Sequence, residues 1–317
     1  MNYLITGVTG FVGRALKGRL LAAGHTVYGV SRNLDVSRSP ELSKKKSQEK
    51  KEPHYFPLQA DLTDSEALRR ALEGMTFDGV FHLAAQSSVK VSWEQPAQTY
   101  QANVQGTAVL IDALKAQKKP PRLLLVSSGE VYGTLCRRDV CRESNPLNPQ
   151  NPYALSKHFS EEIALRFYRG STLVARPFSH LGPGQGEQFA IPNFCRQISE
   201  MRSGLREEVL SVGNIHVTRS VTALSDVLDA YLLLMDKGTT GEAYNVAGDL
   251  RATLEEMLLI LKKLSGVDFS IQVDQSRLRP SDNPEAPVVN CQKLRTLGWV
   301  PKIGLRDMLQ QVWQMYE

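Results

Sequence analysis

The chain has 317 residues, 42% of them hydrophobic, and a formal net charge of +5. This length allows a large core, and no apolar run approaches the roughly 20 residues that span a bilayer. The modest charge, without a concentrated basic face, argues against nucleic-acid binding.

A short apolar strand, a glycine turn and a helix are predicted at the start of the chain. Residues 1–6 are typical of a buried parallel strand, and residues 11–23 have helical spacing. In the turn, Gly7 allows a tight bend, Gly10 lets the backbone approach a pyrophosphate, and Gly13 lets the helix pack closely on the strand. Amides at the helix start then face negative charge. The alternative is an ordinary glycine turn. The motif predicts a dinucleotide cradle formed by Gly7, Thr9, Gly10, Phe11, Val12 and Gly13.

The residues that follow the second predicted strand, 26–30, indicate whether NAD or NADP is preferred. An Asp or Glu there would accept hydrogen bonds from both ribose hydroxyls and favour NAD. The chain has Ser31, Arg32 and Asn33 instead, and a guanidinium beside a hydroxyl suits a 2′-phosphate. We therefore expect NADP(H) to be preferred, with NAD(H) possible. In the alternative interpretation, Arg32 begins a solvated loop.

The third predicted strand, residues 55–58, lies between a polar loop and a candidate adenine contact. The loop, residues 33–53, carries lysines that are diluted by glutamates, and we interpret it as solvated. Asp61 and Leu62 follow the strand and are predicted to contact adenine. An ordinary N-cap for a helix over 63–72 is the alternative role of Asp61 or Asp64.

Two later segments carry an acid/base pattern. Residues 122–126 predict a buried strand, and Ser128 follows its carboxyl end, where ligands of such sheets bind. Tyr153 and Lys157 are i and i+4 on a helix that begins near Pro152, so they share a face. The ammonium is expected to lower the pKa of Tyr153 toward working pH. Tyr153 and Ser128 can then serve the same carbonyl oxygen. A Tyr-x-x-x-Lys pair on a surface helix also arises by chance.

Arginines in later segments are candidate substrate ligands, because guanidinium forks pair bidentately with phosphate oxygens. Arg219 and Arg279 are the best placed. Arg196 is a weaker candidate, because a surface helix over 191–201 explains it equally well. An arginine on a solvated surface is the general alternative.

Ser88, Lys90 and His180 are further polar residues in predicted loops. Ser88 and Lys90 follow the fourth predicted strand, residues 79–83, and can reach a sugar. His180 is better explained as a loop histidine that is hydrogen-bonded to the backbone than as a catalytic base.

The cysteines bear on compartment and metal binding. Cys136, Cys141, Cys195 and Cys291 show no CxxC pair and no metal-ligand spacing, so free thiols and no metal site are expected. The glycine motif begins at residue 7 and leaves no room for a secretory leader. We therefore expect a cytoplasmic protein.

The motifs as a set resemble the extended short-chain dehydrogenase/reductases, the NAD(P)-dependent nucleotide-sugar epimerases, dehydratases and reductases. The GxxGxxG spacing of the cradle favours this branch, and the match covers nearly the whole chain. Further matching segments are residues 82–86, 103–107, 131–133 and 175–178. Within the family, residues 86–93, 178–185 and 278–281 are most similar to the GDP-4-keto-6-deoxymannose reductases, with the GDP-mannose 4,6-dehydratases close by.

The resemblance implies a fold and a set of site residues. The fold is α/β, a doubly wound Rossmann-type parallel sheet with a smaller C-terminal substrate-binding domain. The first domain is expected at 1–178 with a return segment at about 217–248, and the second at 179–216 and 249–317. Catalytic roles are implied for Ser128, Glu130, Tyr153 and Lys157. Cofactor contacts are implied also for Leu83, Ala84, Ala85, Tyr153, Lys157 and Arg176, with Lys157 holding the nicotinamide ribose. Substrate contacts are implied for Gln86, Ser88, Lys90, Ser128, Ser179, Arg196, Arg219 and Arg279.

Glu130 separates the subfamilies. In the dehydratases a Thr-Asp-Glu or Thr-Ser-Glu triplet precedes the Tyr-Gly pair, whereas here the triplet is Ser128, Gly129 and Glu130. Water elimination needs acid/base groups beyond those that reduce a ketone, so a reductase is favoured over a dehydratase or a 4-epimerase. Glu130 as a loop cap is the alternative. A protein that only senses NADP(H) would not need Ser128, Tyr153 and Lys157 together.

Two departures from the family pattern concern the substrate. Ser179 stands where many relatives have an Asn that contacts the diphosphate, and Ser220 replaces the acid after Arg219. The substrate is expected to be a nucleotide-diphosphate sugar whose base these changes leave open. In relatives, two long helices, here predicted over about 96–117 and 152–167, form an intersubunit four-helix bundle. A homodimer is therefore expected, and two ordinary helices covering the sheet are the alternative.

Overall fold

The computed structural model describes residues 1–33, 54–137, 140–278 and 286–317, without the side chains of 135–137. Its residues form two units, Met1–Gly133 with Pro146–Arg176 and Tyr231–Tyr244, and Thr134–Asn145 with Pro177–Ala230 and Asn245–Glu317. Relative to the predicted domains, residues 134–145, 177–178, 217–230 and 245–248 are grouped with the second unit. The polar loop, from residue 34 onward, and Arg279 lie outside the described residues.

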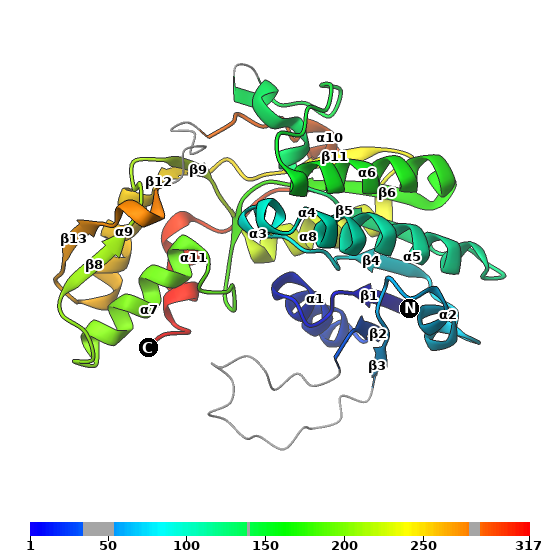
Figure 1. Ribbon diagram of the computed structural model, residues 1–317, viewed down its shortest axis with the longest axis horizontal. Coiled ribbons are helices and arrows are strands. Elements are labelled where there is room, and N and C mark those ends of the chain that lie inside the picture. Colours follow the sequence, from blue (N-terminus) through cyan, green and yellow to red (C-terminus); the bar gives the residue numbers. More distant parts are fainter. Residues whose placement is uncertain (34–53, 138–139, 279–285) are drawn as a thin grey trace. The chain divides into compact units, whose positions relative to one another are not determined.

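A seven-stranded sheet forms the centre of the fold, in the order β11-β6-β5-β4-β1-β2-β3 (Figure 1). Neighbouring strands from β3 to β6 run parallel. The order reverses between β1 and β4, and in such sheets ligands bind beyond the carboxyl ends of the strands at this point. The predicted doubly wound α/β sheet is confirmed. The strands are β1 (Asn2–Thr6), β2 (Thr26–Ser31), β3 (Tyr55–Gln59), β4 (Gly79–His82), β5 (Arg122–Val126), β6 (Thr172–Pro177) and β11 (Ala243–Val246).

Helices cover both faces of this sheet. Alternate residues of β1, β4 and β5 pack with α2, α5 and α6 in one cluster, and α5 and α6 run side by side (Figure 1). α1 buries Leu16 and Leu20 and packs on β1 and β2. The helices of this unit are α1 (Phe11–Ala22), α2 (Ser65–Leu72), α3 (Val89–Glu94), α4 (Pro96–Tyr100), α5 (Gly106–Lys115) and α6 (Pro152–Phe167). α8 (Leu224–Lys237) continues into it from the second unit, and η3 (Gly129–Arg137) and η4 (Arg169–Ser171) are 3₁₀ turns.

The helix predicted over 96–117 contains a π-helical turn. Its middle, η2 (Gln101–Gln105), has π-helical hydrogen bonding between α4 and α5. Asn103, in the centre of η2, is 1% exposed and is hydrogen-bonded to residues of other elements. Such turns are frequent at functional sites. The predicted long helix is therefore present, and its π-helical turn is set by tertiary contacts that periodicity does not report.

The second unit has its own core. α7, α9 and α11 pack together around β8. Its strands pair as β10–β7 and β13–β8, which are parallel, and β12–β9, which are antiparallel. The elements are β7 (His180–Leu181), α7 (Ala190–Arg202), β8 (Val209–Val212), β9 (Thr218–Ser220), β10 (Thr222–Ala223), β12 (Arg251–Thr253), α9 (Leu254–Ser265), β13 (Ser270–Val273), η5 (Gln275–Arg277), α10 (Gln292–Arg295) and α11 (Leu305–Trp313).

The cysteines only partly match expectation. Cys195 and Cys291 are buried free thiols, and burial raises the pKa of each to about 12. Cys141 is disulfide-bonded, so the prediction of free thiols was wrong there. The side chain of Cys136 lies outside the described residues. A disulfide outside a CxxC motif depends on spatial proximity, which spacing does not reveal.

Within the described ranges, none of the helices has the length and apolar character needed to cross a bilayer. The same residues contain no cluster of three or more His, Cys, Asp or Glu side chains that could hold a metal ion.

Candidate active site

The glycine turn between β1 and α1 is shaped by backbone contacts that exclude side chains. Gly7 has a φ of +73°, and a Cβ there would lie 2.7 Å from the Ala84 amide nitrogen. A Cβ on Gly13 would lie 2.1 Å from the Gly7 carbonyl oxygen. Gly10 is the N-cap of α1 and brings no capping side chain. These are the steric requirements expected of a turn that cradles a pyrophosphate at a helix N-terminus.

The residues predicted near adenosine lie at the ends of β2 and β3. Ser31 donates its hydroxyl hydrogen to the Asn33 carbonyl oxygen at 2.8 Å, and Arg32 is exposed. Asp61 accepts from the amide and the hydroxyl of Thr63, both at 2.9 Å. Asp64, not Asp61, is the N-cap of α2, so the capping alternative applies to Asp64. Leu62 is buried.

Ser128, Glu130 and Tyr153 come together at the carboxyl end of β5 and the start of α6. Ser128 lies close enough to Tyr153 to favour its phenolate, and the Ser128 hydroxyl accepts from the Glu130 amide at 3.1 Å. Asn151 caps α6 by accepting from the Ala154 amide at 2.8 Å, and its side-chain amide donates to Glu130 Oε2 at 3.3 Å. The expected meeting of the serine and tyrosine hydroxyls is therefore observed.

The expected direction of the Tyr153 pKa shift was wrong. Burial raises the pKa of Tyr153 to about 12, against the opposing effect of Ser128, and the charge of Glu130 raises it further. Desolvation disfavours the phenolate more than Ser128 favours it. Tyr153 is therefore a neutral phenol at physiological pH, able to donate a proton.

Lys157 lies one turn after Tyr153 on α6 and is 4% exposed. Burial lowers its pKa to about 8, and the charge of Glu161 opposes this effect. No hydrogen-bond or ion-pair partner of its ammonium is found among the described residues. A buried ammonium with three donors to satisfy suits a ligand rich in hydroxyl oxygens.

Arg176, predicted to lie along the cofactor, is held by two other side chains. Its guanidinium pairs with the Glu161 carboxylate, with Nη2–Oε2 at 2.7 Å and Nε–Oε1 at 3.1 Å. Nη1 donates to the Tyr132 hydroxyl at 2.8 Å. Arg176 is 5% exposed and Glu161 is 1% exposed. This buried pair ties β6 to α6, and the cofactor contact of Arg176 stays a prediction.

The segment after β4 is organised by Asn103. Leu83, Ala84 and Ala85 are partly buried, and the Leu83 amide donates to the Thr6 carbonyl oxygen. The side chain of Asn103 forms two hydrogen bonds with the backbone of Gln86, at 2.7 and 3.0 Å.

Three residues predicted to bind substrate follow on this segment. The side chain of Gln86 is hydrogen-bonded to Ser88 and Thr99. Ser88 is the N-cap of α3. Lys90 is exposed and pairs with Glu94 at 3.8 Å. Local contacts thus explain Gln86 and Ser88, whereas the Lys90 ammonium remains exposed.

The other substrate candidates belong to the second unit. Arg196 pairs with Glu187 at 2.9 Å and also with Glu200, so the helix explanation of this arginine holds. Arg219 lies on β9 and is partly buried, and Ser179 is exposed. His180 Nδ1 lies 3.1 Å from the Phe178 carbonyl oxygen, as expected for a histidine bonded to the backbone.

Sequence reasoning assigned no individual role to His82, Asn103, Ser156 or Glu161. All four are buried polar residues of the first unit. Two features of the sequence could have indicated them: a histidine in an otherwise apolar predicted strand, and polar residues on the inner faces of predicted helices.

Comparison with known proteins places this geometry in a family. The family model described as GDP-mannose 4,6 dehydratase matches residues 4–312. The chain is 34% identical to the GDP-6-deoxy-D-mannose reductase of Pseudomonas aeruginosa, over 99% of this chain and 96% of that protein. The structure of RMD from Pseudomonas aeruginosa complexed with NADPH matches with a TM-score of 0.83 and 31% identity, covering 99% of this chain and 98% of that one.

A second solved structure is similar to nearly the same extent. The dTDP-glucose 4,6-dehydratase of Bacillus anthracis in complex with NAD has a TM-score of 0.82 and 25% identity, covering 100% of this chain and 96% of that one. The glycine cradle, the Ser128–Tyr153 pair and the match along the chain lead to one conclusion: the protein belongs to the GDP-mannose 4,6-dehydratase family of the extended short-chain dehydrogenase/reductases.

Proposed function

We propose that this protein is an NADP(H)-dependent reductase of a nucleotide-linked 4-keto-6-deoxyhexose, of the GDP-4-keto-6-deoxymannose type. The observation that carries the proposal is that Ser128 and Tyr153 lie close enough to interact, with Lys157 buried one turn along the same helix. The similarity to a GDP-6-deoxy-D-mannose reductase over 99% of the chain supports this substrate class.

In the proposed mechanism the protein positions the ketone and supplies the proton. NADPH, held at the glycine cradle, would supply a hydride for C4. Tyr153 donates its phenolic proton to the carbonyl oxygen, and Ser128 hydrogen-bonds the same oxygen, so the product is an alcohol. Lys157 donates to the ribose beside the nicotinamide. A tyrosine that burial keeps protonated is the form that reduction requires.

The residues present fit a dinucleotide phosphate. Gly7 and Gly13 leave no room for side chains, and Gly10 caps α1 with backbone alone. Ser31 ends β2 and Arg32 follows it, at the place where an acidic residue would favour NAD. We therefore propose NADPH as the preferred cofactor, with NADH accepted.

A 4,6-dehydratase is the second candidate, since the family model carries that description. A dehydratase or an epimerase begins by oxidising its substrate, so it needs Tyr153 as a base. The raised pKa of Tyr153 and the missing side chain at Gly129 both favour the reductase.

The test is NADPH consumption with GDP-, dTDP- and UDP-linked 4-keto-6-deoxyhexoses, together with conversion of GDP-mannose. Stoichiometric NADPH oxidation with the GDP-linked ketone and no conversion of GDP-mannose is expected. Conversion of GDP-mannose with no net NADPH oxidation would identify a dehydratase. NADPH binding without any turnover would favour a sensor.

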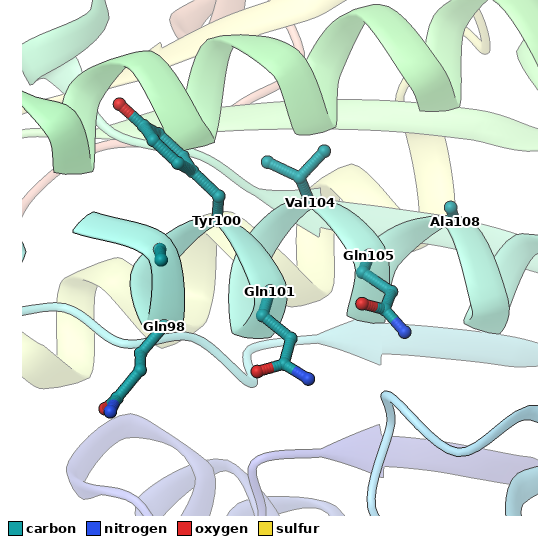
Figure 2. Close-up of a pocket in the computed structure, with 7 residues that line it drawn as sticks. Gln98, Tyr100, Gln101, Val104, Gln105 and Ala108 are labelled. Atoms are coloured by element: carbon teal, nitrogen blue, oxygen red, sulfur yellow. The ribbon is translucent and has the colours of Figure 1, made fainter. Parts of the chain in front are cut away.

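We also propose that the chain forms a homodimer through α4, η2, α5 and α6. A surface pocket is lined by Ala97, Gln98, Tyr100, Gln101, Val104, Gln105 and Ala108. Figure 2 shows Tyr100, Val104 and Ala108 on one side of this helical run and the labelled glutamines on the other. On α6, Phe159 is 44% and Phe167 63% exposed. Apolar side chains of this size on neighbouring helices are typical of an interface.

Sedimentation of the wild-type protein and of Phe159→Glu tests the dimer. We expect a dimer for the wild type and a monomer for the variant. Leu259→Glu, on α9 and 55% exposed, is the matched control and should stay dimeric. A monomeric wild-type protein would refute this proposal.

A further inference from the structure

His82 is a buried side chain for which the proposed reaction has no direct use. It ends β4, is 2% exposed, and has a hydroxyl partner on each ring nitrogen. Nδ1 lies 2.7 Å from Thr6 Oγ1, and Nε2 lies 3.0 Å from Thr107 Oγ1. Burial, together with the charge of Lys157, lowers the pKa of His82 to about 3. The imidazole is therefore neutral at physiological pH.

The partners of the two threonines determine which ring nitrogen carries the proton. Thr107 donates its hydroxyl hydrogen to the Asn103 carbonyl oxygen at 2.6 Å. Toward His82 it can then only accept, so the proton of the imidazole is on Nε2. Nδ1 accepts from the Thr6 hydroxyl, which itself accepts from the Ala84 amide at 3.3 Å. With the other tautomer, the Thr6 hydroxyl hydrogen would find no acceptor in the described part of the chain, a costly state for a buried donor.

The Nδ1 side of His82 leads to the glycine turn. Thr6 is the last residue of β1, directly before Gly7, and its hydroxyl holds the Ala84 amide. That amide nitrogen lies 2.7 Å from the position that a Cβ on Gly7 would occupy. Thr6 thus fixes the two backbone segments that meet where the pyrophosphate is expected.

The Nε2 side leads to the helix that carries Tyr153 and Lys157. The Asn103 carbonyl oxygen, which Thr107 holds, also accepts from the Ser160 hydroxyl at 2.9 Å. The Asn103 side-chain amide donates to Ser156 Oγ at 2.8 Å, and Ser156 donates to the Tyr153 carbonyl oxygen at 2.7 Å. The chain of hydrogen bonds therefore ends on the backbone of Tyr153.

We propose that His82 is a positioning residue with two separable effects. Through Nδ1 and Thr6 it sets the backbone at Gly7 and Ala84, and so the affinity for NADPH. Through Nε2, Thr107 and Asn103 it fixes the position of the α6 residues that carry Tyr153, and so the rate of proton transfer from Tyr153. The second effect rests on the proposed reductase function, whereas the first concerns binding alone.

Two nearly isosteric substitutions separate the two sides. In His82→Asn the amide oxygen can replace Nδ1 as an acceptor, and in His82→Gln the amide nitrogen can replace Nε2 as a donor. We expect His82→Gln to weaken NADPH binding about tenfold with kcat at saturating NADPH unchanged, since one hydrogen bond is lost. We expect His82→Asn to lower kcat about tenfold with the Kd for NADPH unchanged.

The threonines provide matched variants that leave the imidazole in place. Thr6→Val should reproduce the His82→Gln result, and Thr107→Val the His82→Asn result. NADPH titration gives the Kd, single-substrate kinetics give kcat, and urea unfolding checks that each variant is folded. A histidine with a merely structural role would lower stability and change Kd and kcat together in all four variants. That outcome, or no effect in any of them, overturns the proposal.

Failure of the proposed function gives a different result. If the wild type binds NADPH but reduces no 4-keto sugar, the reductase function fails. The difference in Kd between Thr6→Val and Thr107→Val still decides the role of His82. If both histidine variants fail to fold, the threonine pair decides alone.

Discussion

Lys157 and Glu161 lie one turn apart on α6, and the charge of Glu161 counters the lowering that burial imposes on the pKa of Lys157. The resulting pKa of Lys157 is about 8, whereas that of Tyr153 is about 12. Of Lys157 and Tyr153, only Lys157 therefore changes charge near physiological pH. Tyr153 keeps its proton throughout that range.

The first prediction concerns the pH profile of reduction. Because the folded-state pKa of Lys157 is lowered from 10.5 to about 8, its ammonium is lost as the pH rises through about 8. The contact with the cofactor ribose weakens with it, so kcat/KM should be constant near neutral pH and fall above about 8. Initial rates of NADPH oxidation across this range measure the profile.

Lys157→Arg is the control for this profile, because a guanidinium stays protonated well above this range. Its activity should be lower, but the fall near pH 8 should disappear. A wild-type profile that stays flat through pH 8 would contradict the assignment to Lys157.

The sequence predicted those elements whose signals are local. α6 begins and ends at the expected residues because Asn151 and Pro152 are strong start signals and the helical periodicity continues to Phe167. The glycine turn could also be predicted from the sequence, because neighbouring backbone leaves no room for a side chain at these glycines.

The burial of side chains and their pairing with residues distant in the sequence could not be predicted in the same way. The ammonium of Lys157 suggested a lower pKa for Tyr153, but desolvation, a property of the folded core, dominates. The family resemblance implied a cofactor contact for Arg176, but its bond to Glu161, 15 residues earlier, could not be inferred from the sequence. Asn103, in the π-helical turn, is hydrogen-bonded to Gln86 in the loop after β4 and to Ser156 on α6.

The second prediction contrasts two glycines of α1. Gly13→Ala places a Cβ 2.1 Å from the Gly7 carbonyl oxygen, so the turn must shift and NADPH binding should fall at least about tenfold. Gly18→Ala meets nothing within 4 Å and should stabilise the helix by about 0.5–1 kcal/mol. NADPH titration and urea unfolding of both variants measure this contrast. Equal affinities would show that the turn does not bind the cofactor.

The third prediction concerns the buried pair of Arg176 and Glu161. Arg176→Met leaves the Glu161 carboxylate buried and unpaired, which should cost about 3–5 kcal/mol of unfolding free energy. If the arginine is structural, NADPH affinity should change little in the folded variant. Urea unfolding with and without NADPH measures both quantities. A large loss of affinity at unchanged stability would restore Arg176 as a cofactor ligand.

The fourth prediction concerns cofactor choice. Arg32→Ala removes the exposed guanidinium that we assign to the 2′-phosphate. We expect KM for NADPH to rise about tenfold while KM for NADH stays the same, since a charge-assisted bond to a phosphate is lost. Arg19→Ala, in the last turn of α1, is the control, because it removes one positive charge at a different position. Equal changes for both cofactors would exclude a role in phosphate recognition.

The fifth prediction concerns the two hydroxyls that meet at the end of β5. Tyr153→Phe removes the proton donor and should lower kcat by about 10²–10⁴-fold, whereas NADPH affinity should be retained. Ser128→Ala leaves the donor in place and removes one hydrogen bond to the carbonyl oxygen, so a smaller loss is expected. The double variant should be little slower than Tyr153→Phe, because both groups act on one oxygen and their effects are not additive. Single-turnover reduction of a GDP-linked 4-keto sugar, with NADPH bound in advance, measures all three. If the two losses simply multiplied, the hydroxyls would be acting at separate places, and the shared carbonyl oxygen on which the proposed reduction depends would have to be abandoned.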